Sequence, residues 1–189
     1  MTKMVTVTFE STAPYSQSRM HDTPKLPKEL ADAYEQRTWR EKCNANDSGE
    51  IVVPAMAFKQ ALDTVARRLG ETIPGKGKAT FTKHFVGGVL CAADLNTGVK
   101  KEDVPSVTIN ANSDGVRGSG KRVKRTFPQI TKWSGQTQFM IVDDTVTKDL
   151  FERYITEAGK FIGVGRFRPE NGGMNGRFKP TKFEWIEDA

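Results

Sequence analysis

The sequence predicts an α+β fold in which two helices cover one face of an antiparallel sheet. Between Lys3 and Phe9, apolar residues alternate with threonines, the period of two that is typical of a strand with one buried face. Residues 54–69 and 147–158 repeat apolar residues at helical spacing. Short apolar runs supply the other strands. The order strand, helix, strands, helix, strand is that of the ferredoxin-like or RRM-like fold.

The length of the chain and its termini limit the possible architectures. At 189 residues the chain is long enough to bury a full core in one domain. We expect a single RRM-like domain over residues 1–189, with insertions at about 15–50 and 112–126. No apolar run approaches the ~20 residues that cross a bilayer, and the first residues lack a signal-peptide core. We therefore expect a cytoplasmic protein of a bacterial or phage-infected host cell, without membrane contact.

The first half of the chain places a loop, an inserted helix and a core helix after the first strand. The loop is polar and carries Tyr15 and Arg19. Pro27 suits the first position of a partly exposed helix within the first insertion. Pro54 opens the clearest helix, and Gly70 ends it.

The second half alternates short strands with one further helix. Residues 81–92 are expected to form a strand with a bulge at Gly87 and Gly88. Short strands follow at residues 106–110 and 138–142. Thr147 is the expected cap of the second core helix, and a final strand covers residues 182–187.

The segment IGVGRFRPENGGMNGRF, residues 162–178, is rich in glycine and arginine. Glycine permits positive φ and close approach of a ligand to the main chain. Backbone N–H groups in such turns form anion-binding concavities, and arginine donors fit phosphate oxygens. The alternative is a flexible surface turn with solvated arginines. The candidate binding residues here are Gly163, Gly165, Gly173, Gly176, Arg166, Arg168 and Arg177.

A second basic segment, SDGVRGSGKRVKR, sets five cations against Asp114. Serine and glycine at its tip predict a hairpin finger, and clustered positive charge favours a polyanionic partner. The net charge of +6 also favours a polyanionic partner, although many basic proteins never bind nucleic acid. A soluble charged face is the alternative. The candidate binding residues of the finger are Arg117, Lys121, Arg122, Lys124 and Arg125.

The chain offers few residues for metal or acid–base chemistry. Cys43 and Cys91 are far apart, and neither cysteine nor histidine occurs at metal-ligand spacing. We expect no metal site, no cofactor and no catalytic residue. His21 beside Asp22, or alternatively His84, could still move protons in a metal-independent nuclease.

Three segments resemble the RAMP superfamily of CRISPR effector proteins, and within it the backbone subunit that coats guide RNA. IVVPAMAFKQAL is similar to the opening of that family's first helix, and GVGRFRPENGGMNGRF is similar to its glycine-rich loop. The basic finger, residues 115–125, lies where such subunits carry a thumb-like extension. A compact relative from a bacteriophage or mobile element is equally compatible.

The resemblance and the residues together imply a non-catalytic protein that grips the phosphate backbone of RNA or single-stranded DNA. Lys59 of the first motif, with Arg19 and Tyr15 of the early loop, completes the set of candidate binding residues. The resemblance further implies cooperative assembly as a homo-oligomer or filament on the strand, and it makes other effector-complex subunits candidate partners. A phage inhibitor or mimic that acts by protein–protein contact is the alternative.

Overall fold

The computed structural model describes residues 2–112, 118 and 120–187. The two longest helices are α2 (Ala55–Leu69) and α4 (Lys148–Phe161), and the shorter ones are α1 (Ala31–Thr38), α3 (Thr82–Gly88) and the 3₁₀ turns η1 (Trp39–Lys42) and η2 (Pro169–Asn171). The strands are β1 (Lys3–Ser11), β2 (Tyr15–Ser16), β3 (Glu50–Val53), β4 (Val89–Cys91), β5 (Leu95–Lys100), β6 (Ser106–Asn112), β7 (Arg122–Ile130), β8 (Ser134–Ile141) and β9 (Phe178–Glu187).

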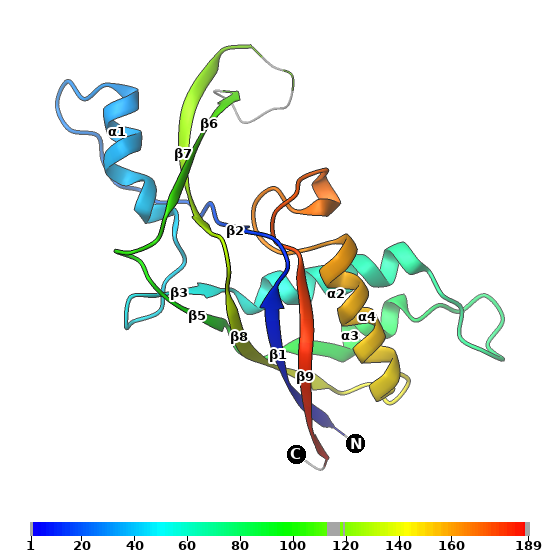
Figure 1. Cartoon of the computed structure of the whole chain (residues 1–189). Coiled ribbons are helices and arrows are strands. Elements are labelled where there is room, and N and C mark those ends of the chain that lie inside the picture. The colour runs from blue at the N-terminus through cyan, green and yellow to red at the C-terminus, as the bar shows by residue number, and fades with distance from the viewer. Residues whose placement is uncertain (1, 113–117, 119, 188–189) are drawn as a thin grey trace.

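The central sheet has the strand order β4-β8-β1-β9, and every neighbouring pair is antiparallel. Helices α2 and α4 lie together beside this sheet (Figure 1). In chain order these elements read β1, α2, β4, β8, α4, β9. This is the ferredoxin-like α+β arrangement, so the predicted fold class is confirmed.

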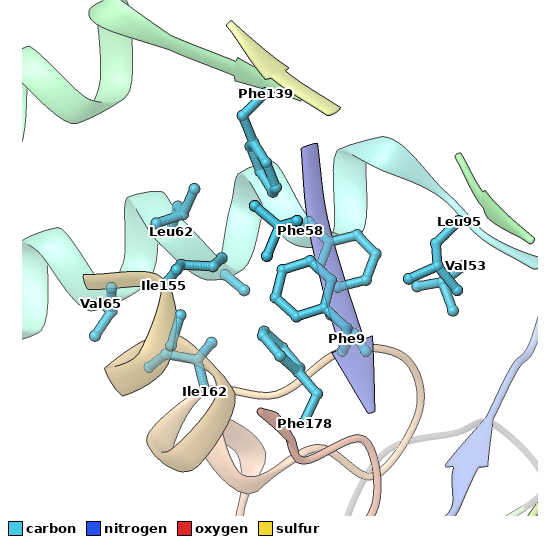
Figure 2. Close-up of a cluster of buried hydrophobic side chains, with 14 of the residues drawn as sticks. Phe9, Val53, Phe58, Leu62, Val65, Leu95, Phe139, Ile155, Ile162 and Phe178 are labelled. Carbon is cyan, nitrogen blue, oxygen red and sulfur yellow. The ribbon is translucent and has the colours of Figure 1, made fainter. Parts of the chain in front are cut away.

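Alternation along β1 builds one wall of the core. Val5, Val7 and Phe9 are fully buried, whereas the threonines between them face the open side of the sheet. Phe9 stacks on Phe58 of α2 with 5.0 Å between ring centroids, and meets the edge of Phe178 at 5.1 Å. Figure 2 shows these rings converging between α2 and the start of β9. Aromatic pairs of this kind add about 0.5–1.5 kcal/mol each beyond burial.

The residues that the sequence predicts to end α2 and to cap α4 do so in the structure. Gly70 ends α2 in the left-handed conformation with φ 56°, which costs glycine little. The hydroxyl of Thr147 caps α4 by accepting a hydrogen bond from the Leu150 backbone N–H at 3.3 Å. Val146 and Phe151, on either side of the cap, are both buried, which is the arrangement of a hydrophobic staple.

The expected strand over residues 81–92 is wrong, because most of it is helix α3 and only β4 pairs with β8. Phe85 stacks on Tyr154 of α4 at 4.2 Å, and the Thr82 hydroxyl donates to the Ala66 carbonyl at 3.1 Å. Gly88 allows the Asp143 side chain to lie against the helix. These contacts between distant segments override the local strand propensity.

Strands β6 and β7 form a long antiparallel hairpin that rises away from the central sheet, with α1 nearby (Figure 1). At its base β7 pairs with β2, and a separate pair joins β3 to β5. From here on, the finger means the described part of this hairpin, residues 106–112, 118 and 120–130, which includes part of the basic segment 115–125. Within the described ranges, no helix is long and apolar enough to cross a membrane.

Candidate functional site

A cavity of about 440 Å³ lies between the N-terminal half of α2, the segment after β2 and the loop after α4. We call residues 162–177 the Gly/Arg loop. The loop forms one wall of the cavity and α2 forms the facing wall. The lining residues are Tyr15, Gln17, Ser18, Arg19, Asn44, Pro54, Ala57, Gln60, Ala61, Thr64, residues 162–168, Glu170 and Asn171.

Backbone hydrogen bonds hold the Gly/Arg loop against β2 and itself. The Arg166 N–H donates to the Ser16 carbonyl at 2.7 Å, and the Val164 N–H donates to the Gly176 carbonyl at 2.9 Å. A side chain at Gly165 would put its Cβ 2.5 Å from the Ser16 oxygen, and one at Gly176 would collide with the Val164 carbonyl. Both glycines also have φ near 77° and 76°. The structure gives them a packing role inside a fixed loop.

Arg166 is held between two aromatic rings at the edge of the cavity. Its guanidinium carbon lies 3.3 Å from the centroid of Phe127 in β7 and 3.7 Å from that of Phe167. Burial lowers the pKa of Arg166 to about 10, so the side chain remains charged at neutral pH. Its Nη1 is buried and has no hydrogen-bond partner among the described residues.

A buried ionic cluster lies behind Arg166 and joins η1 to the finger. The carboxylate of Glu35, 3% exposed, accepts from Lys42 Nζ, from the Thr126 N–H at 2.7 Å and from Arg125 Nη1 at 3.4 Å. Burial opposes ionisation of Glu35, yet the hydrogen bonds from Lys42 and Thr126 hold its pKa below the ordinary value. Burial likewise lowers the pKa of Lys42. The cluster ties α1 and η1 to β7 of the finger.

The structure brings six of the predicted binding residues to one place. Arg19 is exposed, and its backbone N–H donates to the Lys42 carbonyl at 2.9 Å. Arg168 is half-buried and pairs with Glu170 at 2.7 Å. Three arginines therefore face the cavity against one glutamate. The predicted residues that line the cavity are Tyr15, Arg19, Gly163, Gly165, Arg166 and Arg168.

Other predicted residues have structural partners outside the cavity. Arg177 donates to the carbonyls of Lys160 at 3.2 Å and Met174 at 3.4 Å, beside Gly173 and Gly176 in the same loop. Lys59 pairs with Asp63 and donates to the Phe85 and Val86 carbonyls, 3.2 Å and 2.9 Å away, which ties α2 to α3. These contacts explain the positions of Arg177 and Lys59 without a ligand.

The cations of the finger fall into two groups. Lys121, Arg122 and Lys124 are exposed, and Arg125 is half-buried beside Glu35. Arg117 lies outside the described residues. The exposed cations lie on β7 and just before it, in the same strand whose Phe127 stacks on Arg166. The finger and the loop are therefore physically connected.

The ring of Tyr15 is buried, so it is not free to stack on a base. It is 2% exposed, lies edge-on to Trp133 at 6.0 Å between centroids, and accepts a hydrogen bond from the Gln17 amide at 3.0 Å. Burial raises the pKa of its phenol. Tyr15 is thus part of the cavity floor, whereas Phe167 is 42% exposed at the rim.

Sequence reasoning missed several lining residues, namely Asn44, Gln60, Thr64, Phe167 and Asn171. Gln60 and Thr64 are four residues apart on α2, outside its apolar stripe, and that spacing is the one signal that could have placed them on a common face. Asn44 carried no local signal, because its position depends on contacts with distant residues: its N–H donates to Gln17 Oε1 at 2.6 Å, and its carbonyl accepts from the Val52 N–H at 3.0 Å.

Neither histidine lies at the cavity. His21 Nδ1 is 3.1 Å from the Thr23 hydroxyl, and His84 Nδ1 is 2.6 Å from Asp143 Oδ2 near α3. In the part of the chain that the structure describes, no group of three histidine, cysteine, aspartate or glutamate residues could hold a metal ion. The cavity instead presents arginines, amides and one exposed aromatic ring.

Comparison with solved structures finds proteins of similar fold. No model of a protein family and no curated sequence matches the chain. A chain in the cryo-EM structure of the Type III-B Cmr-beta bound to cognate target RNA aligns with TM-score 0.50 and 12% identity, over 98% of this chain and 61% of that one. Cmr6 from Pyrococcus furiosus aligns with TM-score 0.50 and 13% identity, over 96% of this chain and 99% of that one. A chain of a CRISPR RNA-guided surveillance complex aligns at TM-score 0.39 with 13% identity.

The two alignments at TM-score 0.50 confirm, at the level of the fold, the resemblance that the sequence motifs indicated, because this chain shares the architecture of the two Cmr chains. This chain spans only about three fifths of the length of the first matched chain, and it spans nearly all of the Cmr6 chain. At 12–13% identity the comparison concerns architecture alone.

Proposed function

We propose that this protein binds single-stranded nucleic acid, RNA or DNA, without cleaving it, and that phosphates lie against the Gly/Arg loop. The observation that carries the proposal is that Arg19, Arg166 and Arg168 line one cavity, against the single carboxylate of Glu170. Guanidinium groups donate strong, charge-assisted hydrogen bonds to phosphate oxygens. The fold supports this reading, since the Cmr-beta structure is described as bound to target RNA.

The exposed cations of the finger extend the proposed path of the strand. Lys121, Arg122 and Lys124 have room to meet phosphates, and the stacking of Phe127 on Arg166 links them to the cavity. We further propose that several copies line up along a long strand, with the finger reaching toward a neighbouring copy. Tandem binding raises the effective concentration at each added site.

Binding of fluorescent single-stranded oligonucleotides over a series of salt concentrations tests the proposal. Each neutralised phosphate of a single strand contributes about −0.7 to the log–log slope, so four to six contacts predict roughly −3 to −4. Replacing Lys121, Arg122 and Lys124 together by alanine should reduce the magnitude of that slope by about 2 and leave the melting temperature unchanged.

Two experimental results would contradict the proposal. Affinity that does not change with salt would exclude phosphate contacts as the source of binding. Incubation with labelled RNA and DNA, with and without magnesium, checks that the strands stay intact. Cleavage would instead favour a nuclease, which has no support in the geometry of His21 or His84.

A further inference from the structure

We propose that the cavity takes one base of the bound strand and reads its hydrogen-bonding edge, so that binding depends on base identity at one nucleotide. This inference rests on the proposed function and goes beyond it, because phosphate contacts alone are blind to sequence. It is based on a difference in charge between the two walls of the cavity. The loop wall carries Arg166 and Arg168, whereas the α2 wall carries no charged residue among those that line the cavity.

The uncharged wall presents hydrogen-bonding groups that the protein itself leaves unused. Gln60 and Thr64 lie one turn apart on α2, and Asn44 lies beside them in the cavity lining. Among the described residues, none of these three side chains has a hydrogen-bond partner. Amide side chains carry a donor and an acceptor together, the combination that pairs with a base edge.

The cavity also offers surfaces suited to the flat faces of a base. Tyr15, Ala61, Ile162 and Val164 lie at its floor and are each at most 2% exposed. Phe167 stands at the rim, 42% exposed, where it can stack on a base.

The position of Phe167 is built into the loop. Its backbone has φ 58°, a conformation that side-chain-bearing residues rarely adopt. The Asn175 N–H donates to the Phe167 carbonyl at 2.9 Å and holds that conformation. Strained backbone that is held in place in this way is typical of binding sites.

The volume of the cavity and the charges of its lining residues fit a nucleotide better than a phosphate alone. A volume of about 440 Å³ falls within the ~300–1,000 Å³ of pockets that enclose small organic ligands. A phosphate on the arginine wall would leave the neutral part of the cavity free for the attached base.

The test compares RNA oligonucleotides of equal length and equal charge. Homopolymers of adenine, cytosine and uracil and a fully abasic strand, each of about eight nucleotides, fall within typical single-strand site sizes of ~4–16 nucleotides. We expect the wild-type protein to bind one homopolymer at least about tenfold more tightly than the other two homopolymers and than the abasic strand, because stacking alone would favour all three homopolymers alike. The variant Gln60→Leu should lose most of that preference and keep its affinity for the abasic strand.

Gln138→Leu is the matched control, because Gln138 is exposed on the opposite, open face of the sheet. It should behave as wild type. Equal, salt-dependent binding of all four strands would overturn the base-reading inference while the proposed function stands. A preference that survives in Gln60→Leu would also overturn it, because the base would then be read elsewhere. No binding of any strand would remove the proposed function, and this inference with it.

Discussion

At the scale of the residue, Arg166 serves both stability and the proposed binding. Its guanidinium is stacked on Phe127 and Phe167, and one of its nitrogens remains a buried donor without an acceptor in the described residues. Arg168 lines the same cavity, but its partner is Glu170 at the half-exposed surface. The two arginines should therefore respond differently to substitution.

We predict that Arg166→Ala lowers the free energy of unfolding by about 2 kcal/mol, because desolvated cation–π contacts with both rings are lost. Arg168→Ala should change stability by less than about 0.5 kcal/mol, as exposed ion pairs contribute little. Both variants should weaken binding of single strands. Denaturant titration and oligonucleotide binding separate the two effects. An Arg166→Ala protein as stable as wild type would show that the stacked arrangement contributes nothing to stability.

Glu35 gives a second prediction at this scale, with a defined pH dependence. The folded protein holds the pKa of Glu35 below its unfolded value, so the carboxylate stabilises the fold above that unfolded value of about 4.3. The stabilisation is lost as the pH falls through the folded pKa. Glu35→Gln at neutral pH leaves Lys42 buried without its anion, which should cost about 3 kcal/mol.

The difference between wild type and Glu35→Gln should shrink in acid, where the wild-type carboxyl is also neutral. Glu41→Gln is the control, because Glu41 forms an exposed pair with Lys101 and should change stability by less than about 1 kcal/mol. Denaturant titrations across the acidic range measure both. A gap between wild type and Glu35→Gln that is constant with pH would contradict the account of this carboxylate.

At the scale of the element, α3 shows how tertiary contacts decide local structure. Its residues are β-branched, aromatic and glycine-rich, which favoured a strand with a bulge. The helix is fixed by Phe85 against Tyr154 and by the close approach of Gly88 to Asp143. Two adjacent glycines at the end of this helix thus have different surroundings, since no atom lies within 4 Å of a Cβ at Gly87.

This contrast predicts opposite effects of two alanine substitutions. Gly87→Ala should stabilise the protein by about 0.5–1 kcal/mol, because alanine favours the helix and meets open space. Gly88→Ala should destabilise it by at least about 1 kcal/mol, because the new methyl group collides with Asp143. Thermal melts of the two variants provide the measurement. Equal effects of both substitutions would contradict the helical packing described for α3.

At the scale of the whole molecule, the fold could be predicted further than the site. The alternation in β1 and the apolar stripes of α2 and α4 are local patterns, and they sufficed for the ferredoxin-like order. The Gly/Arg loop was also found locally. The opposite wall of the cavity was not, because Asn44 and Gln60 come from separate segments that only the tertiary structure brings to the loop.

The open face of the central sheet offers the main alternative surface for a strand. Domains of the RRM type stack bases on aromatic residues of that face. Here Thr6 aligns with Gln138 and Glu184, and Thr8 aligns with Gln136 and Lys182. These rows carry polar residues and one pair of opposite charges, Lys182 with Glu184, and neither row contains an aromatic residue. We therefore propose that a strand lies at the cavity and the finger instead.

Photo-crosslinking of thiouridine-labelled single-stranded RNA, followed by peptide mass spectrometry, tests this placement most directly. We predict crosslinks in the Gly/Arg loop at Phe167, in α2 near Gln60 and in the finger near Lys121. Crosslinks that instead centre on the open sheet face, at Thr6 and Gln138, would contradict the central claim.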